Sequence, residues 1–531
     1  MDWFESAGLS LIVFLPAAGA LALFAVPKAR EDLQKWLALL TTGLTAVLAV
    51  AVAARFNYGG SEKFQFEVSE SWIPAIGARY HIGVDGISLP LLVLSAVVTV
   101  LAVIYSWDHW DEPRNVRGFL ALMLLLATGM NGTFVALDLV LFFIFFELVL
   151  LPMYFMIGIW GDSAKRRIPV LGRTVTMRLY AAIKFFLFTL FGSAFMLLGF
   201  LALYFRSGDF LGDNTFDIPT LIELGSRNAF GSGTFAFLVF GAMFLGFAVK
   251  VPMWPFHTWL PDAHTAAPTV GSVLLAAILL KLGSYAFLRI SIPILPDMAR
   301  EWAPFIGLLA VIGIIYGALG CLAQTDMKRL IAFSSVAHMG FVMLGIATLT
   351  PIGINAAVFG MVAHGIITGM LFFLAGSVKE RYHTLEISRL GGLLKSAPRM
   401  GWILAISAMA SLGLPGLAGF WGEFPVILSA YNPAAGLSEG TFRTYMVIAA
   451  VGTVFAAGYL LWLFQRSAFG EPKPEWEGHV IADVNRFEWA AWAPLIIAMV
   501  LFGWVPGLIF GVVDDVSTGI AESISAAVGG S

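Results

Sequence analysis

The stretch GFAVKVPMWPFHTWLPDAHTAAPTVGSVLLAAILLKLGSY, residues 246–285, decides how the rest of the chain is interpreted. Lys250 lies in an apolar run that Pro252 and Pro255 break at once, and Lys281 lies in a second apolar run. A lysine at the centre of a membrane helix costs roughly 3 kcal/mol or more, and prolines there free backbone groups that need new partners. The pattern therefore predicts proline-broken helices that line an ion path through a membrane. The alternative, a lysine that only extends to the membrane surface, applies to Lys250 more readily than to Lys281, which apolar residues flank on both sides.

Composition places the chain in a membrane. Hydrophobic residues make up 59% of the 531 residues and charged residues 12%, against roughly 25% charged in a soluble domain. The net charge of -3 and the lack of a basic tract give no indication of nucleic-acid binding. The single cysteine, Cys321, excludes an internal disulfide, an iron–sulfur cluster and a thiolate zinc site. No basic residue precedes the first apolar run, so we do not expect a signal or transit peptide.

Apolar runs long enough to cross a bilayer as helices recur along what we interpret as a single integral membrane domain, 1–531. They lie near 7–27, 34–54, 86–106, 117–135, 138–160, 179–205, 233–256, 268–290, 302–323, 328–348, 353–378, 400–430, 442–465 and 489–511. Cytoplasmic connections usually carry an excess of lysine and arginine. With the N-terminus outside, the inner connections hold 20 basic residues and the outer ones 8, while three lie within spans. This bias supports fourteen spans and predicts that both termini face outward.

A weak internal repeat divides the chain. Three spans occupy 1–116, five occupy 117–290, five occupy 302–466, and the last helix is expected at 489–511 with a short tail. The seventh span breaks at Pro252, and the twelfth breaks five spans later at Pro415 and Gly416. An odd offset reverses orientation, so the two groups of five form an inverted repeat, as in transporters. We therefore expect an all-α membrane protein with two inverted five-helix repeats, each containing a broken helix.

Further ionisable residues lie within apolar segments: Glu147, Lys184, His338, His364 and Glu423. Burial disfavours the charged form of such groups, whereas a nearby opposite charge restores it. Their protonation can therefore change near physiological pH, and histidine needs little tuning to take part. We expect a set of groups that pass protons as neighbouring charges make and break pairs.

Structural roles are the alternatives for several of these groups. A lysine near a span end, such as Lys184, can extend to the inner surface, and Asp262 can cap a turn between two helices. His257 and His264 lie near the inner side, where structural hydrogen bonding is as good an interpretation as proton transfer. Asp85, just before the third span, is interpreted as a cap rather than as part of a path.

His338 and His364 have two further alternatives. They can be ordinary helix-packing residues, or they can be the axial ligands of a haem, which requires histidines at matched depth on facing helices. Nothing in their spacing favours the haem. No glycine-rich phosphate loop stands at a strand-to-helix turn, so we do not expect a dinucleotide site of that kind.

Three stretches resemble a known family. PFHTWLPDAHTAAPTVGSVLLAAILLKLGSY, residues 255–285, is similar to the signature of the antiporter-like subunits of respiratory complex I, the proton-pumping NADH:quinone oxidoreductase. SVKERYHTLEISRLGGL (377–393) and SLGLPGLAGFWGEF (411–424) resemble the M type of these subunits, in which a glutamate stands where the L and N types carry lysine. The resemblance covers nearly the whole chain.

The resemblance implies a proton channel made of two linked half-channels. The implied roles are pairing of Glu147 with Lys250, onward relay by Lys281, connection of the halves by His338 and His364, and an outer terminal carboxylate at Glu423. Separating Glu147 from Lys250 is expected to loosen the lysine's hold on its proton and drive it onward. Lys184, His257, His264 and Asp262 are possible supporting residues, and Pro252, Pro255, Pro415 and Gly416 are the helix breaks.

The same resemblance implies a division of labour between subunits. This chain would bind no metal and no redox cofactor, and NADH, FMN, iron–sulfur clusters and quinone would belong to partner subunits. Other membrane subunits, L-like and N-like, would be its neighbours in the bilayer, in a bacterial inner membrane rather than a mitochondrial one. A subunit of an Mrp-type cation/proton antiporter or of a membrane-bound hydrogenase is the alternative. A passive scaffold is a third, against which the buried ionisable groups argue.

Overall fold

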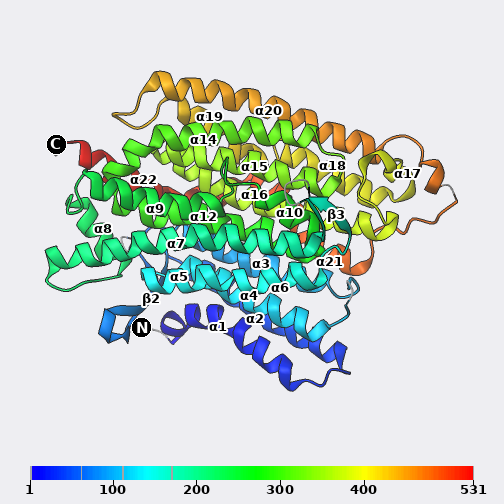
Figure 1. The fold of residues 1–531 in the computed structure, drawn as a ribbon, viewed down its shortest axis with the longest axis horizontal. Coiled ribbons are helices and arrows are strands. Elements are labelled where there is room, and N and C mark those ends of the chain that lie inside the picture. Colours follow the sequence, from blue (N-terminus) through cyan, green and yellow to red (C-terminus); the bar gives the residue numbers. More distant parts are fainter. Residues whose placement is uncertain (1–2, 61–62, 111–112, 169–171, 477, 530–531) are drawn as a thin grey trace.

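The structure, a computed structural model, describes residues 3–60, 63–110, 113–168, 172–476 and 478–529. Within these residues, twelve helices are long and apolar enough to cross a membrane, and two further spans are each broken into two shorter helices. The expected fourteen spans are therefore confirmed. They run side by side along the long axis of the molecule (Figure 1).

The unbroken spans are α1 (Trp3–Ala25), α2 (Glu31–Arg55), α3 (Ser88–Tyr105), α4 (Val116–Val135), α5 and α6 (Leu139–Leu148 and Leu150–Trp160), α7 (Met177–Leu211), α11 to α13 (Thr269–Leu274, Leu280–Ala286 and Ile292–Ile294), α14 (Pro296–Leu322), α15 (Met327–Ala347), α16 (Pro351–Tyr382), α20 (Glu439–Ala468) and α21 (Arg486–Trp504). The broken spans are α9 (Thr234–Lys250) with α10 (Trp259–Ala266), and α18 (Pro398–Ser411) with α19 (Ala418–Tyr431). The remaining α-helices are α8 (Ile218–Ser226), α17 (Leu393–Ser396) and α22 (Gly507–Gly529).

Two small antiparallel hairpins mark the opposite ends of the bundle. β1 (Gln65–Ile73) pairs with β2 (Ala78–Val84), and β3 (Lys165–Ile168) pairs with β4 (Arg173–Thr176). In Figure 1, β2, α8 and both chain ends lie at the left end of the bundle, and β3 lies toward the right. We call these the β1–β2 end and the β3–β4 end. Much of the connection from 55 to 85, expected only to be partly polar, is therefore an ordered hairpin.

A buried histidine fastens the first hairpin to the bundle. His81 Nδ1 lies 2.5 Å from Asp217 Oδ1, and His81 Nε2 lies 2.8 Å from Glu67 Oε1. Burial alone would lower the pKa of His81, but the two carboxylates outweigh it and raise that pKa above its ordinary value. Asp217 also caps α8 by accepting a hydrogen bond from the Thr220 amide, so β2 and α8 are held together.

The end of the chain differs from the expected last helix at 489–511. α21 ends at Trp504, because Pro506 disfavours helical geometry at the preceding residue, Val505, whose φ is -125°. A separate helix, α22, then begins at Gly507 and packs against α14 and α16. It is not among the helices with the length and composition of a span, so the tail is a packed helix at the β1–β2 end rather than a short extension.

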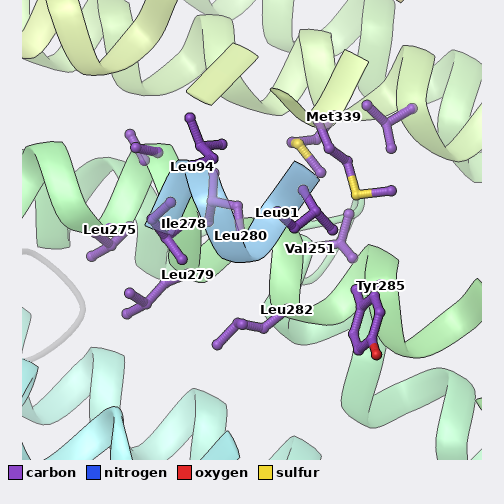
Figure 2. Packing of buried hydrophobic residues seen from close by; sticks show 14 of the residues in the cluster. Leu91, Leu94, Val251, Leu275, Ile278, Leu279, Leu280, Leu282, Tyr285 and Met339 are labelled. Atoms are coloured by element: carbon purple, nitrogen blue, oxygen red, sulfur yellow. The ribbon is translucent and has the colours of Figure 1, made fainter. Parts of the chain in front are cut away.

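Burial identifies the centre of the bundle. The apolar windows of α16 and of the span α11 to α13 are entirely buried, whereas only 33% of the α2 window is. Peripheral helices present apolar side chains outward, including Leu21, Leu40, Leu198 and Val454. Lipid is the surrounding that suits such a surface. Figure 2 shows leucine side chains of the central span α11 to α13, among them Leu279 and Leu282, close to Leu91 and Leu94 of α3.

Candidate functional site

The first helix break leaves Lys250 at a helix end inside the protein. α9 stops at Lys250, and α10 begins only at Trp259, with Pro252 and Pro255 between them. Because proline lacks an N–H group, the break leaves carbonyl groups without helical partners. The Trp259 indole donates a 2.9 Å hydrogen bond to one of these, Val249 O. The remaining free carbonyls of a helix C-terminus favour a cation such as Lys250.

Glu147 and Lys250 are neighbours without a direct ion pair. The Lys250 amine is buried, has no hydrogen-bond partner within the described ranges, and lies 4.6 Å from the centroid of the Phe146 ring. Glu147, near the end of α5, is close enough for its charge to act on Lys250. Its carboxylate oxygen Oε1 has no hydrogen-bond partner among the described residues. Glu147 and Lys250 are therefore neighbours, but no hydrogen bond or ion pair joins their side chains.

Lys281 lies at the centre of the molecule, bonded to a histidine of the second half. Its amine donates a 2.5 Å hydrogen bond to Ala276 O and lies 2.7 Å from His364 Nδ1 on α16. Both side chains are buried. π-helical turns at Leu275–Leu279 and Phe287–Ser291 flank α12, and such turns are frequent at functional sites. When Lys281 donates to Nδ1, the neutral imidazole carries its own proton on Nε2, which has no partner in the part of the chain that the structure describes.

His338 and Glu423 form the second bonded pair. His338 Nδ1 on α15 lies 2.6 Å from Glu423 Oε1 on α19. The other ring nitrogen lies 3.2 Å from both the Ser411 hydroxyl and the Tyr459 hydroxyl. Partners on three other helices, α18, α19 and α20, therefore fix the orientation of this imidazole, and both of its nitrogens have partners.

A small cavity separates the two histidines. Their ring centroids are 5.9 Å apart, and the space that they line with Glu423 and Ser411 has a volume of about 20 Å³. A cavity needs roughly 10–15 Å³ of this kind to admit one water molecule. The space can therefore hold a water between the imidazoles, but it cannot hold a porphyrin, which argues against the haem alternative.

The second helix break positions Glu423. α18 ends at Ser411 and α19 begins at Ala418, with Pro415 between them. Gly413 and Gly416 have φ angles of +80° and +92°, which side-chain-bearing residues rarely adopt. A Cβ atom at Gly413 would lie 3.3 Å from Glu423 Oε2. The break thus lets the backbone approach the carboxylate closely.

Lys184 and Asp262 form an ion pair rather than reaching the surface separately. The Lys184 amine lies 2.7 Å from Asp262 Oδ2 and donates a 2.8 Å hydrogen bond to Thr258 O. Arg329 lies 3.6 Å from the other oxygen of Asp262. The pair connects α7 to α10 and neutralises charge beside the first break.

His257 and His264 form no hydrogen bond with the bonded pairs described above, Lys281 with His364 and His338 with Glu423. Lys281, His364, His338 and Glu423 are called the buried row below. The His257 ring contacts Tyr316 edge-on at a centroid distance of 4.9 Å. His264 stacks on Phe372 at a ring-centroid distance of 4.3 Å, and among the described residues neither of its ring nitrogens has a hydrogen-bond partner. Lys328 and Lys281 are both close enough for their charges to act on His264.

Several polar residues of this region were not singled out from the sequence. Tyr459 and Ser411 orient His338, and Lys328, counted among the inner basic residues, is buried and donates a 2.5 Å hydrogen bond to Ala267 O. Tyr459 is the one polar side chain in the apolar run AAGYLLWLF, which was the available signal. Nothing in the sequence separated Lys328 from its basic neighbour.

Two cavities open toward the β3–β4 end. One, of about 260 Å³, is lined by residues that include Asp108, His109 and Glu380, and the other, of about 240 Å³, by Asp162, Lys328 and Glu380. His109 Nε2 lies 2.9 Å from Glu380 and 3.7 Å from Glu488. Burial opposes the charged ring, but these carboxylates prevail and raise the pKa of His109 to about 9. Among the described residues, no three His, Cys, Asp or Glu side chains are grouped to hold a metal.

Comparisons with known proteins match this architecture. Residues 136–449 match the family model described as NADH:quinone oxidoreductase/Mrp antiporter, TM. NADH-quinone oxidoreductase subunit M from Rhodobacter capsulatus is 39% identical over 530 residues, 98% of each chain. A chain of respiratory complex I from Thermus thermophilus has a TM-score of 0.83 and 30% identity, covering 97% of this chain and 99% of that one. A chain of the Mrp complex from Dietzia sp. also has a TM-score of 0.83, but its 22% identity indicates the fold alone.

The fold and the buried row of titratable groups define an antiporter-like membrane subunit. The chain belongs to the family of transmembrane subunits shared by NADH:quinone oxidoreductases and Mrp antiporters.

Proposed function

We propose that this chain is the proton-translocating M-type membrane subunit of an NADH:quinone oxidoreductase. The observation that carries the proposal is the row Lys281, His364, His338 and Glu423, which links the two halves at the buried centre. Each member can bind and release a proton, and a water between the imidazoles completes a hydrogen-bonded route. High similarity over the whole chain to a subunit M supports the type of complex.

The direction of transport follows from the orientation. We place the β3–β4 end inside and the β1–β2 end, with both termini, outside, as the excess of basic residues favours. Protons are taken up from the inner side near Lys250 and through the cavities beside Lys328, pass Lys281 and the histidines, and leave past Glu423. Lys184, Asp262, His257 and His264 support the inner part of this route.

In this proposal, other subunits of the complex supply the redox cofactors and the neighbouring membrane subunits. NADH, FMN, iron–sulfur clusters and quinone are held by partner subunits, and L-like and N-like membrane subunits are the neighbours. The chain lies in a bacterial inner membrane, a proposal that the bacterial source of its relatives supports. Quinone reduction elsewhere in the complex is coupled to charge movement in this chain.

The separated pair Glu147 and Lys250 is the proposed trigger. An unbonded buried carboxylate and amine respond strongly to a small change of distance, because the interior screens charge weakly. When Glu147 moves away, Lys250 releases its proton toward Lys281. Full proton pumping by an assembled Glu147→Gln complex would remove Glu147 from this role.

Inside-out membrane vesicles provide the test of function. NADH-driven proton uptake and quinone reduction are compared between the parent, Lys250→Ala and the control Lys395→Ala, whose exposed lysine pairs with Glu471. We expect both activities of Lys250→Ala to fall together, with normal assembly, and Lys395→Ala to match the parent. Unchanged activities in Lys250→Ala would make the lysine structural and the route wrong.

The composition of the purified complex distinguishes an NADH:quinone oxidoreductase subunit from a subunit of an Mrp-type antiporter. Flavin and NADH oxidation activity co-purify with the chain if it is an oxidoreductase subunit, and are absent if it belongs to an antiporter. A scaffold that conducts nothing would retain normal activities in all of the buried variants.

A further inference from the structure

A buried arginine, Arg289, lies on the same central span as Lys281, farther toward the β1–β2 end. Lys281, Tyr285 and Arg289 are spaced by four residues along the same central span, so they follow one another along one side of it. Arg289 was assigned to an outer connection from the sequence, but its side chain is only 6% exposed. The structure therefore places a permanent positive charge inside the protein, between Lys281 and the β1–β2 end.

Three groups hold this guanidinium in place. Arg289 Nη2 lies 2.5 Å from Asp85 Oδ1, and Arg289 Nε donates a 3.0 Å hydrogen bond to the Tyr285 hydroxyl. The Tyr285 hydroxyl in turn donates a 2.9 Å hydrogen bond to Phe134 O. The ring of Phe64 lies 5.0 Å from the guanidinium carbon on another side. Asp85, which lies between β2 and α3, thus holds Arg289 directly, and α4 holds it through Tyr285.

Asp85 is itself held, so the arrangement is rigid. As expected from the sequence, it caps α3, and its Oδ1 accepts hydrogen bonds from the amides of Ile87 and Ser88 at 3.1 and 3.0 Å. Its position directly after β2 also ties the guanidinium to the hairpin. A buried ion pair of this kind adds little net stability, because removing both charges from water offsets their attraction. A role in proton transport therefore explains this buried Arg289–Asp85 ion pair better than a contribution to stability does.

The two halves differ in the polar groups that follow the central titratable residues. In the second half, the groups next to His338 are a carboxylate and two hydroxyls, which can accept or pass a proton. In the first half, the groups beyond Lys281 end in a guanidinium that cannot lose its proton and repels an incoming one. Fixed arginines act as barriers to protons and cations in channels.

We propose that Arg289, held by Asp85 and Tyr285, is an electrostatic plug that closes the β1–β2 end of the first half to protons. The inference rests on the proposed function. A proton that reaches Lys281 is then prevented from leaving directly through its own half, and is directed sideways to His364. Without the plug, the same lysine would connect the two sides of the membrane and let protons flow back.

The test measures leak rather than turnover. The double variant Arg289→Met/Asp85→Asn removes both charges at similar volume, in the intact complex reconstituted into vesicles. We expect assembly and NADH oxidation to continue, the passive proton conductance to rise at least severalfold, and the stimulation of NADH oxidation by an uncoupler to disappear. Arg289→Lys, which keeps a positive charge, is the matched control and should leak little.

Two further variants keep the outcomes distinct. Adding Lys281→Met to the double variant should abolish the leak, because the leaking proton passes through that lysine. Arg289→Gln, which still bonds Tyr285, serves if the double variant does not assemble. A tight membrane in an assembled Arg289→Met/Asp85→Asn or Arg289→Gln complex, or a leak that persists with Lys281→Met, overturns the plug. Normal pumping by Lys281→Met alone would instead overturn the proposed function.

Discussion

His338 is bonded to Glu423, the carboxylate that takes up its proton in the proposed route. The carboxylate lies 2.6 Å from Nδ1, while the other nitrogen faces only neutral hydroxyls. An amide in place of the carboxylate keeps the size of the side chain but cannot take up a proton from the imidazole. We therefore expect Glu423→Gln to lower NADH-driven proton uptake at least about tenfold, since a positioned proton-transfer group typically contributes that much or more.

The exposed carboxylate Glu475, which pairs with Arg389, provides the control. Glu475→Gln should leave proton uptake in inside-out vesicles at the parent value. Equal uptake by Glu423→Gln and Glu475→Gln would show that the outward step does not use Glu423.

His109 should make the stability of the protein depend on pH. Its pKa in the folded protein is about 9, against 6.5 for an ordinary histidine. The stabilisation, on the order of 3 kcal/mol before screening, is complete below about pH 6.5 and is lost as pH rises through about 9. His109→Gln should therefore lower the melting temperature of the complex at pH 6 and have little effect at pH 10.

His479, which is exposed, is the matched position for this measurement. His479→Gln should not change the melting temperature at either pH. A His109→Gln deficit that is the same at pH 6 and pH 10 would mean that packing, and not charge, explains the role of the ring.

Sequence indicated some site residues and not others for a physical reason. Lys281, His364 and Glu423 interrupt apolar runs, and an intramembrane charge is conspicuous because it is costly. Arg289 and Lys328 stand near span ends, where basic residues usually meet water, and only the packing of other helices buries them. The absence of a direct Glu147–Lys250 ion pair depends on where α9 breaks, which the sequence does not specify to within one turn.

At the scale of elements, the second break relies on Gly416. Its φ of +92° is strained for any residue with a Cβ atom. We expect Gly416→Ala to destabilise the complex by roughly 1 kcal/mol or more and to lower proton uptake, because α19 carries Glu423. Gly440→Ala, at the start of α20 with nothing near the added methyl group, should be neutral or slightly stabilising. Thermal unfolding of both variants checks this, and an unstrained Gly416→Ala would contradict the stated role of the break.

Both broken helices were predictable, whereas the ends of the unbroken ones were less so. Proline within an apolar run removes a helical hydrogen bond wherever it stands, so residues 252–255 and 415–416 identified the breaks. The first hairpin and α22 were missed as elements, because they lie outside the spans and are held by tertiary contacts such as His81 to Asp217.

At the scale of the whole molecule, the proposed orientation has a direct consequence. Cys321 is buried, so an introduced cysteine can be labelled selectively. Ser226→Cys at the β1–β2 end should react with an impermeant maleimide in intact cells, and Lys165→Cys at the β3–β4 end only after permeabilisation. The reverse pattern would invert the route.

The central claim is that one buried row carries protons between the halves, and Lys281 is the member of that row that the first half contributes. The most direct measurement is NADH-driven proton uptake by inside-out vesicles carrying Lys281→Met, with assembly verified and Lys395→Ala alongside. We predict that proton uptake and quinone reduction are both lost in Lys281→Met and retained in Lys395→Ala. Proton uptake at the parent rate in an assembled Lys281→Met complex would contradict the account.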